Sequence, residues 1–281
     1  MGVAVHGWQR TAGGVVLQTA SGAVSASLLV GADGLHSRVR RAAGLAIRWR
    51  GPRRFGIRRH FRVQPWSPFV EVHWGEAAEA YITPVGPQRI GVAFLWSGGP
   101  RSFAAALRDF PVVEARLSTA IPETAPRGAG PLRQGVGRRC AYDVALIGDA
   151  AGYLDAISGE GLTLAFRSAR ALADSVARGK PLREYDRAYR RLSRSYYRLT
   201  ALLLALTSRP RMRSLLFRTL ARWPSLFDRL LAAHTAEPSR VLSGVEHMVA
   251  TDRPRGIAGP MQRAARRGEP SSVGQRTCAP L

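Results

Sequence analysis

Two aspartates stand where an apolar stretch of the sequence runs into glycine, and each could bind the hydroxyl groups of a ligand. Asp33 falls in LLVGADGLHSRVR (28–40), and Asp149 falls in ALIGDAAGYLDAISGEGLTLAFRS (145–168). A carboxylate at the carboxyl end of a strand lies where α/β sheets bind ligands, and it can accept hydrogen bonds from a polyol chain. Either aspartate alone is more typical of a turn, but two such sites in one chain favour a shared binding function.

Glycines after Asp149 predict a helix N-terminus that is open to a ligand. Gly159, Glu160 and Gly161 precede Leu162, where an apolar helical pattern starts. The first N–H groups of a helix have no intrahelical partner, and the helix dipole gives that end a partial positive charge. A planar, electron-accepting ring with a carbonyl facing this end would therefore be stabilised when it gains charge. Glu160 is a carboxylate that could act on such a ring, although a first-turn residue stabilised by the dipole is the simpler interpretation.

Hydrophobic patterns place these residues within alternating β and α segments. Apolar runs predict strands at 3–8, 15–19, 24–30, 69–74, 80–85, 90–96 and 143–148, with a hairpin around Ser21-Gly22. Helical spacing predicts helices at 36–43, 102–119, 162–178, 182–207, 211–221 and 225–234, with Ser37 as an N-cap. Residues 122–137 are expected to form a loop, and 250–281 a disordered tail.

The two aspartate motifs together resemble the Asp-Gly and Gly-Asp fingerprints of FAD-dependent oxidoreductases with the p-hydroxybenzoate hydroxylase fold. The resemblance covers roughly residues 1–235. It implies that Asp149, after Gly148, hydrogen-bonds the ribityl chain of FAD, and that the backbone from Gly159 to Leu162, with Glu160 and Gly161, faces the flavin pyrimidine edge. It also implies that Asp33 and Gly34 lie near the FAD pyrophosphate and ribose and take part in the use of NAD(P)H.

The resemblance implies an α/β fold: an incomplete Rossmann-like FAD-binding domain with an inserted antiparallel β-sheet substrate domain and C-terminal helices. Residues 1–50 would hold the Asp-Gly part of the FAD-binding domain, 51–135 the β-sheet domain, and 136–180 the rest of the FAD-binding domain. Residues 181–249 would form C-terminal helices, followed by the tail at 250–281.

Several features depart from the family pattern. The strand–GxGxxG–helix unit that seats the ADP half of FAD is absent, since GVGRRC (135–140) follows a loop. One explanation is that the start was assigned too late or that the gene is truncated, and the other is that a partner chain or a changed binding mode supplies the missing half. We favour a late start or a truncated gene. The chain as given is expected to be poorly stable and to bind FAD weakly or not at all. Gly152 stands where hydroxylases usually have His, and Gly-Glu-Gly is closer to the geranylgeranyl reductase-like branch.

Arginine dominates the charge of the chain. The formal net charge is +23, and Lys180 is the only lysine among 42 basic residues. Arginines spread evenly from Arg10 to Arg276 are typical of a GC-rich coding bias, although a strongly basic chain can bind nucleic acid or an anionic surface. The densest stretch, 48–62, could be a nucleic-acid surface, but a β-segment with one solvated face is the preferred interpretation. No nucleic-acid partner is expected.

The remaining signals bear on compartment and partners. Two distant cysteines, Cys140 and Cys278, make neither a disulfide framework nor a metal site, and no signal peptide is recognised, so we expect a cytoplasmic location. The longest apolar run, 199–207, is too short to span a bilayer. The helices at 182–234 are expected to cover the substrate pocket, with peripheral membrane contact as an alternative. The oligomeric state stays open.

The leading functional interpretation is an NAD(P)H-linked flavoprotein that acts on an apolar or aromatic small molecule, as a monooxygenase or as a geranylgeranyl reductase-like enzyme. His73, Trp74 and Tyr81 could line its substrate pocket, although aromatic residues on strands more often belong to a core. The alternatives are a basic protein that binds nucleic acid or a membrane surface, and a non-functional remnant of a flavoenzyme.

Overall fold

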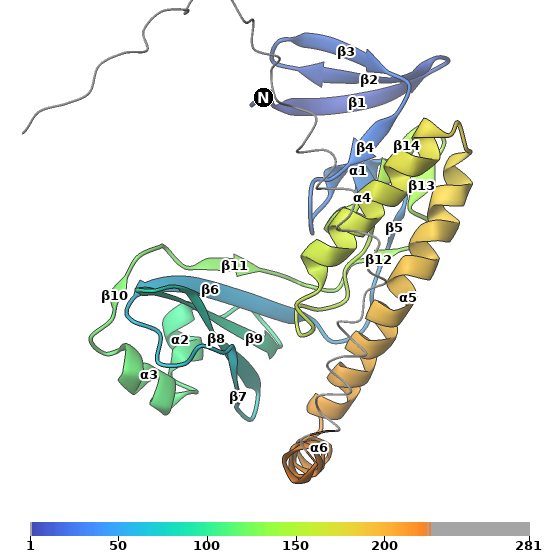
Figure 1. The fold of residues 1–281 in the computed structure, drawn as a ribbon. Helices are drawn as coiled ribbons and strands as arrows, with labels where there is room; N and C mark the ends of the chain where they lie inside the picture. The colour runs from blue at the N-terminus through green and yellow to red at the C-terminus, as the bar shows by residue number, and fades with distance from the viewer. Residues whose placement is uncertain (1, 224, 226–281) are drawn as a thin grey trace, which may run out of the picture. The chain divides into compact units, whose positions relative to one another are not determined.

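The computed structural model describes residues 2–223 and 225. Residues Met1–Ala221 form one compact unit, and Arg222–Leu281 form a second. The helix expected at 225–234 lies outside the described residues except for Ser225, and the tail expected at 250–281 lies wholly outside them. The domain boundaries drawn from the sequence stay predictions, while the mixed α/β architecture is confirmed (Figure 1).

The chain begins with a three-stranded antiparallel meander. Its strands are β1 (Val5–Thr11), β2 (Gly14–Thr19) and β3 (Gly22–Ala26). The expected hairpin is confirmed, because Thr19 pairs with Gly22 across the turn. The single strand expected at 24–30 is wrong: after β3 the chain starts a new strand, β4 (Leu29–Gly31), in another sheet. Strand β3 is mostly exposed, whereas Leu29 and Gly31 of β4 are buried. The first part of the expected strand therefore lies at the surface and the second part lies in the core.

A small mixed sheet of three strands, with one antiparallel and one parallel pair, belongs to the α/β part. Its strands are ordered β13 (Cys140–Ala141), β14 (Val144–Leu146) and β4, and β14 runs parallel to β4 with Leu146 opposite Gly31. Strand β4 leads into helix α1 (Arg38–Ala42), where the Ser37 hydroxyl accepts a hydrogen bond from the Arg40 amide, which confirms the expected N-cap. A further two-stranded sheet joins β5 (Ala46–Ile47) to β12 (Gly135–Val136).

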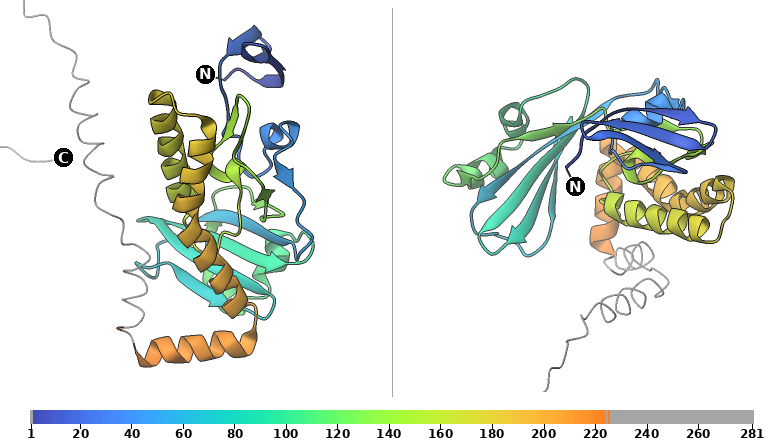
Figure 2. Two further views of the ribbon diagram at one scale, coloured as in Figure 1. Left: turned by 90° about the vertical axis from the view of Figure 1, so that its right-hand side faces the viewer. Right: turned by 90° about the horizontal axis from the view of Figure 1, so that it is seen from above.

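Strand β14 runs into a short 3-10 turn, η1 (Gly148–Ala151), and then into two long helices. Helix α4 (Gly161–Ala177) and helix α5 (Leu182–Thr207) lie side by side in all three views (Figures 1 and 2). Both helices pack onto the sheet of β13, β14 and β4, because Leu146, Leu164 and Tyr185 belong to one buried cluster. The Tyr185 hydroxyl also donates a hydrogen bond to the Leu146 carbonyl at 2.5 Å.

The middle of the chain folds into the expected antiparallel sheet. Its order is β10 (Ile121–Pro122), β6 (Arg54–Arg62), β9 (Arg89–Ser97), β8 (Ala78–Gly86) and β7 (Glu71–Trp74), and β11 (Arg127–Ala129) also pairs with β6. The loop expected at 122–137 is therefore wrong in part, since it holds β11 and β12. The single helix expected at 102–119 is two helices, α2 (Phe103–Leu107) and α3 (Pro111–Leu117), because Pro111 cannot continue a preceding helix and begins a new one.

Helix α6 (Pro210–Arg222) follows α5 and packs beside β7, where the rings of Phe217 and Trp74 lie 5.8 Å apart. In the part of the chain that the structure describes, no helix combines the length and the apolar character needed to cross a membrane.

Candidate functional site

The carboxyl ends of the two parallel strands β4 and β14 meet. The Ile147 amide donates to the Gly31 carbonyl at 3.0 Å, which continues the ladder between β14 and β4 by one residue. Beyond this point a cleft of about 360 Å³ opens between the strand ends and the first turn of α4. We call it the Asp149 cleft, and it is lined by Ala32, Gly34, Ile147, Gly148, Asp149, Tyr153, Gly161, Leu162 and Ala165. Five of the eight predicted cofactor-binding residues are among them: Gly34, Gly148, Asp149, Gly161 and Leu162.

The Asp149 carboxylate has the features expected of a ligand-binding group. It is partly buried, and burial raises the pKa of its carboxyl. Among the described residues, no side chain or amide donates a hydrogen bond to its carboxylate oxygens. A Cβ built on Gly161 would lie 3.9 Å from Asp149 Oδ1, so the carboxylate lies beside the start of α4. A partly buried carboxylate without a protein donor takes its hydrogen bonds from water or from a ligand, so Asp149 is available to a ligand that enters the cleft.

Part of the lining of the cleft has no bulky side chain, because Gly34, Gly148 and Gly161 belong to it. Gly148 has φ +57°, a left-handed conformation that favours glycine, and its amide donates to Ser168 Oγ at 3.1 Å. Helix α4 starts at Gly161 and has 17 residues, long enough for a substantial dipole. The first amides of α4 have no intrahelical acceptor. Together these features offer N–H donors and close backbone approach on the side of the cleft that faces Asp149.

Asp33 has a different environment from Asp149. Its Oδ2 atom accepts hydrogen bonds from the amides of Arg38 at 2.7 Å and Val39 at 3.1 Å. Burial alone would raise the pKa of Asp33, but hydrogen bonds from the Ser37 hydroxyl and from these amides outweigh it and lower the pKa. The Asp33 carboxylate therefore holds the start of α1, and it does not line the Asp149 cleft. This placement agrees with the turn interpretation of Asp33, while Gly34 next to it does reach the cleft.

Gly159 and Glu160 also lie outside the lining of the cleft. Gly159 has φ +70°, and its amide donates to the Ala156 carbonyl at 3.1 Å, so it shapes the turn before α4. Glu160 is the N-cap residue of α4, and its carbonyl accepts the Leu164 amide. Both residues position the helix start, which agrees with the simpler interpretation of Glu160.

Arg40 is a site residue that sequence reasoning missed. Its side chain is only 1% exposed, and its guanidinium donates to four acceptors. These acceptors are the carbonyls of Asp149 (3.2 Å), Ala150 (3.1 Å) and Leu35 (2.7 Å) and the Gln134 side-chain oxygen (2.8 Å). Arg40 thus ties the loop after β4 to the turn that carries Asp149. Nothing in the string SRVRR separates Arg40 from its exposed neighbours, so no sequence signal marks it.

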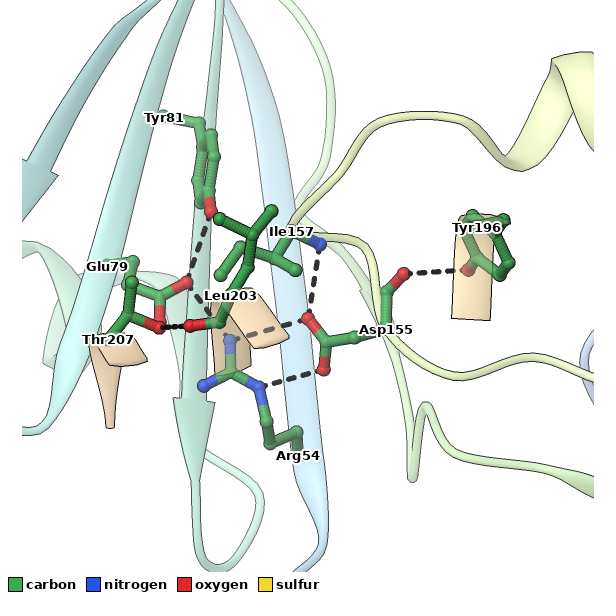
Figure 3. A network of polar contacts seen from close by, with 8 residues as sticks. All are labelled: Arg54, Glu79, Tyr81, Asp155, Ile157, Tyr196, Leu203 and Thr207. Atoms are coloured by element: carbon green, nitrogen blue, oxygen red, sulfur yellow. Dashed lines mark hydrogen bonds and ion pairs between the residues drawn. The ribbon is translucent and has the colours of Figure 1, made fainter. Parts of the chain in front are cut away.

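A second missed group links the antiparallel sheet to the loop before α4 (Figure 3). Arg54 on β6 contacts Asp155 at 2.8 Å and Glu79 on β8 at 3.0 Å, and all three side chains are largely buried. Burial opposes the charge of Arg54, but the two carboxylates outweigh it and raise the pKa of the guanidinium. Asp155 also accepts the Ile157 amide, and its carbonyl accepts the Tyr196 hydroxyl on α5. The network therefore joins three parts of the fold at the segment that leads into α4.

The aromatic residues proposed for a substrate pocket have other partners. The Tyr81 hydroxyl donates to Glu79 at 3.1 Å (Figure 3), and burial raises the pKa of Tyr81. His73 contacts Glu71 at 3.1 Å, and Trp74 packs against Phe217. None of Tyr81, His73 and Trp74 lines the Asp149 cleft. Within residues 2–223 and 225, no cluster of three or more His, Cys, Asp or Glu side chains could hold a metal ion.

The fold is that of flavin-dependent halogenases and monooxygenases, and the chain therefore has a flavoenzyme-like fold. The flavin-dependent halogenase CmlS superposes with a TM-score of 0.59 at 19% identity, over 73% of this chain and 42% of that one. PqsL, a probable FAD-dependent monooxygenase from Pseudomonas aeruginosa, gives 0.58 at 20% identity, over 77% and 66%. Halogenase PltM, solved in complex with FAD, gives 0.57 at 16% identity, over 66% and 45%.

These similarities are structural. No family model matches the sequence, and no curated protein matches it either. The chain spans 42% of the CmlS structure and 66% of the PqsL structure, so it corresponds to only part of the proteins it resembles.

Proposed function

We propose that this chain forms the ribityl- and ring-binding part of an FAD-dependent oxidoreductase. The observation that carries the proposal is the Asp149 carboxylate, which is partly buried, lacks a protein donor and lies beside the N-terminus of α4 in a cleft lined by glycines. The halogenase and monooxygenase folds that superpose on the chain support the same conclusion.

The residues present fit the middle of a flavin dinucleotide. Asp149 would accept hydrogen bonds from the ribityl hydroxyls, which are the donors that its carboxylate lacks. The first amides of α4 would donate to a ring carbonyl, where the helix dipole stabilises negative charge. Gly34 and Gly148 present no side chain, so the ligand can contact the backbone there. The flavin would supply hydride and electron transfer when bound, and the protein would bind, orient and shield it.

The finer parts of the assignment are also proposals. We infer NAD(P)H as the reductant and an apolar or aromatic small molecule as the substrate, as a monooxygenase or a geranylgeranyl reductase-like enzyme would use. We also propose a cytoplasmic location, with which the lack of a disulfide partner for Cys140 among the described residues agrees. Because the chain spans only part of the structures it matches, its own affinity for FAD is expected to be weak.

Titration of FAD with the full chain, followed by flavin fluorescence anisotropy, tests the proposal. Asp149→Ala should weaken binding about ten-fold to a hundred-fold, as expected for a hydrogen bond to a charged group worth about 1.5–3 kcal/mol. Asp174→Ala is the control for the loss of one carboxylate, because Asp174 is exposed on helix α4 and lies outside the cleft. Weak, saturable binding that Asp149→Ala reduces and Asp174→Ala does not is the expected result, and equal loss in both variants would contradict a flavin site at Asp149.

A further inference from the structure

Helix α5 presents two opposite faces of different chemistry. One face is buried against the fold and carries Tyr185, Tyr189, Ser193, Tyr196 and Thr200. The other face is exposed, and we call it the arginine face: it consists of Arg183, Arg187, Arg190, Arg191, Arg194 and Arg198. Residues three, four and seven positions apart lie on the same side of a helix. The six guanidinium groups therefore follow one another along about 22 Å of the helix.

The charge of this face is almost uncompensated. Arg190 contacts Asp186 at 3.0 Å and the Gly137 carbonyl at 3.0 Å. The other five arginines have no carboxylate within ion-pair distance among the described residues. Of the two acidic residues on α5, Glu184 pairs with Lys180 and Asp186 is largely buried.

Paired arginines elsewhere in the fold show that this pattern is local. Arg54 contacts two carboxylates, Arg101 contacts Asp109 at 2.7 Å, and Arg89 contacts Glu123. Arginines in other parts of the fold therefore do find carboxylate partners. The high arginine content of the chain does not by itself explain why a continuous row on one helix face lacks them. Like charges at i, i+4 spacing also destabilise a helix slightly. A row of this kind is stable in contact with a surface that carries the opposite charge.

We propose that the arginine face of α5 docks on the anionic surface of a membrane. Guanidinium groups bind phosphate through parallel N–H donors, so a row of them suits a plane of lipid phosphates. The next helix, α6, exposes Met212 and Leu215 between Arg211 and Arg218, a pattern typical of helices that lie at a lipid headgroup region. The exposed row on α5 carries no aromatic side chain, whereas single-stranded nucleic acid is usually bound by stacking on aromatic rings.

The contact is peripheral and electrostatic, because the apolar side of α5 is already buried in the protein. It should weaken with added salt. Each arginine near an anionic leaflet contributes about 1 kcal/mol, which corresponds to about five-fold in affinity. Neutralising four of the six should therefore weaken binding to anionic vesicles on the order of several hundred-fold.

The test compares two fourfold variants of the full chain that have the same net charge. The arginine-face variant replaces Arg187, Arg191, Arg194 and Arg198 with Gln. The control variant replaces four exposed arginines with Gln at other places, namely Arg41, Arg48, Arg50 and Arg127. Glutamine is a good helix former, so α5 should keep its structure, and circular dichroism checks this. Binding is measured by co-sedimentation with vesicles of phosphatidylcholine, alone or with about one-third phosphatidylglycerol, and separately with a single-stranded oligothymidine.

The proposal expects salt-sensitive binding to the anionic vesicles, no binding to neutral vesicles, and a loss of binding that is confined to the arginine-face variant. Equal losses in the two variants would overturn it, because they would show that overall charge is sufficient. It would also be overturned if the chain did not bind anionic vesicles at low salt. Loss of oligothymidine binding without loss of vesicle binding would assign the face to nucleic acid instead.

Discussion

Arg40 offers the sharpest test of how the site is held together. Its guanidinium is buried and donates to three carbonyls and one side-chain amide oxygen, two of them on the turn that carries Asp149. Arg40→Met keeps an unbranched, apolar stem but ends short of the guanidinium and removes every donor. We therefore expect a large loss of stability.

The magnitude follows from the contacts. A hydrogen bond that involves a charged group contributes about 1.5–3 kcal/mol. The sum over the four hydrogen bonds is therefore an upper limit on the loss of stability, and the net loss is smaller. The variant also avoids the cost of burying a guanidinium, which is several kcal/mol. The carbonyls of Asp149 and Ala150 are left without this donor. Each buried acceptor left unsatisfied costs about 1–3 kcal/mol, so the net loss should be about 3–5 kcal/mol.

Arg41→Met is the matched control. Arg41 is the next residue on the same helix and is exposed, so its loss changes the net charge equally and should shift stability by less than about 0.5 kcal/mol. Urea unfolding followed by circular dichroism gives both values, with Arg40→Lys as a milder variant if Arg40→Met does not fold. Destabilisation of Arg40→Met within about 1 kcal/mol of the control would refute the view that Arg40 ties the two loops together.

Three further predictions concern charge and packing around the site. Asp149→Asn should stabilise the ligand-free chain at neutral pH, because burial penalises the ionised carboxyl and raises its pKa. The difference in free energy of unfolding between Asp149→Asn and the parent chain should shrink as the pH falls through the raised pKa toward the ordinary value of 3.8. Unfolding curves at several pH values that showed this difference growing as the pH falls would contradict the prediction. Gly31→Ala should cost about 1–3 kcal/mol in chemical denaturation, since its Cβ would lie 2.7 Å from Leu146 Cδ2; an unchanged midpoint would mean that the parallel strands are not packed as described. Asp155→Asn removes a charge 2.8 Å from Arg54 and should cost about 2–3 kcal/mol, whereas a neutral effect in the same assay would show that the network does not hold the loop before α4.

Local patterns were sufficient to predict most of the elements. Strand and helix periodicity located the long helices and the antiparallel sheet, because side-chain alternation and helical spacing record which residues face a core. The errors came where a short-range signal was overlooked or overridden. Pro111 divides the expected helix at 102–119, and the run at 24–30 divides because its two halves pair with different strands.

The sequence also predicted two of the strand ends that border the candidate site. Gly-Asp and Asp-Gly steps after apolar runs indicated two strand ends, and parallel pairing of β4 with β14 does bring those ends together at the cleft that contains Gly34 and Asp149. Because the carboxyl ends of parallel strands meet at one edge of a sheet, residues that follow both strands lie close together.

The sequence by itself determined the elements and the approximate place of the site, while the tertiary structure decided what each polar group does. Asp33 and Asp149 look alike in the sequence, yet the amides of α1 occupy one carboxylate and leave the other free for a ligand. Arg40 differs from Arg41 only because folding brings residues 149 and 150 against it. The physical reason is that a hydrogen bond depends on which distant atoms come within reach, and the chain's local pattern does not record those contacts.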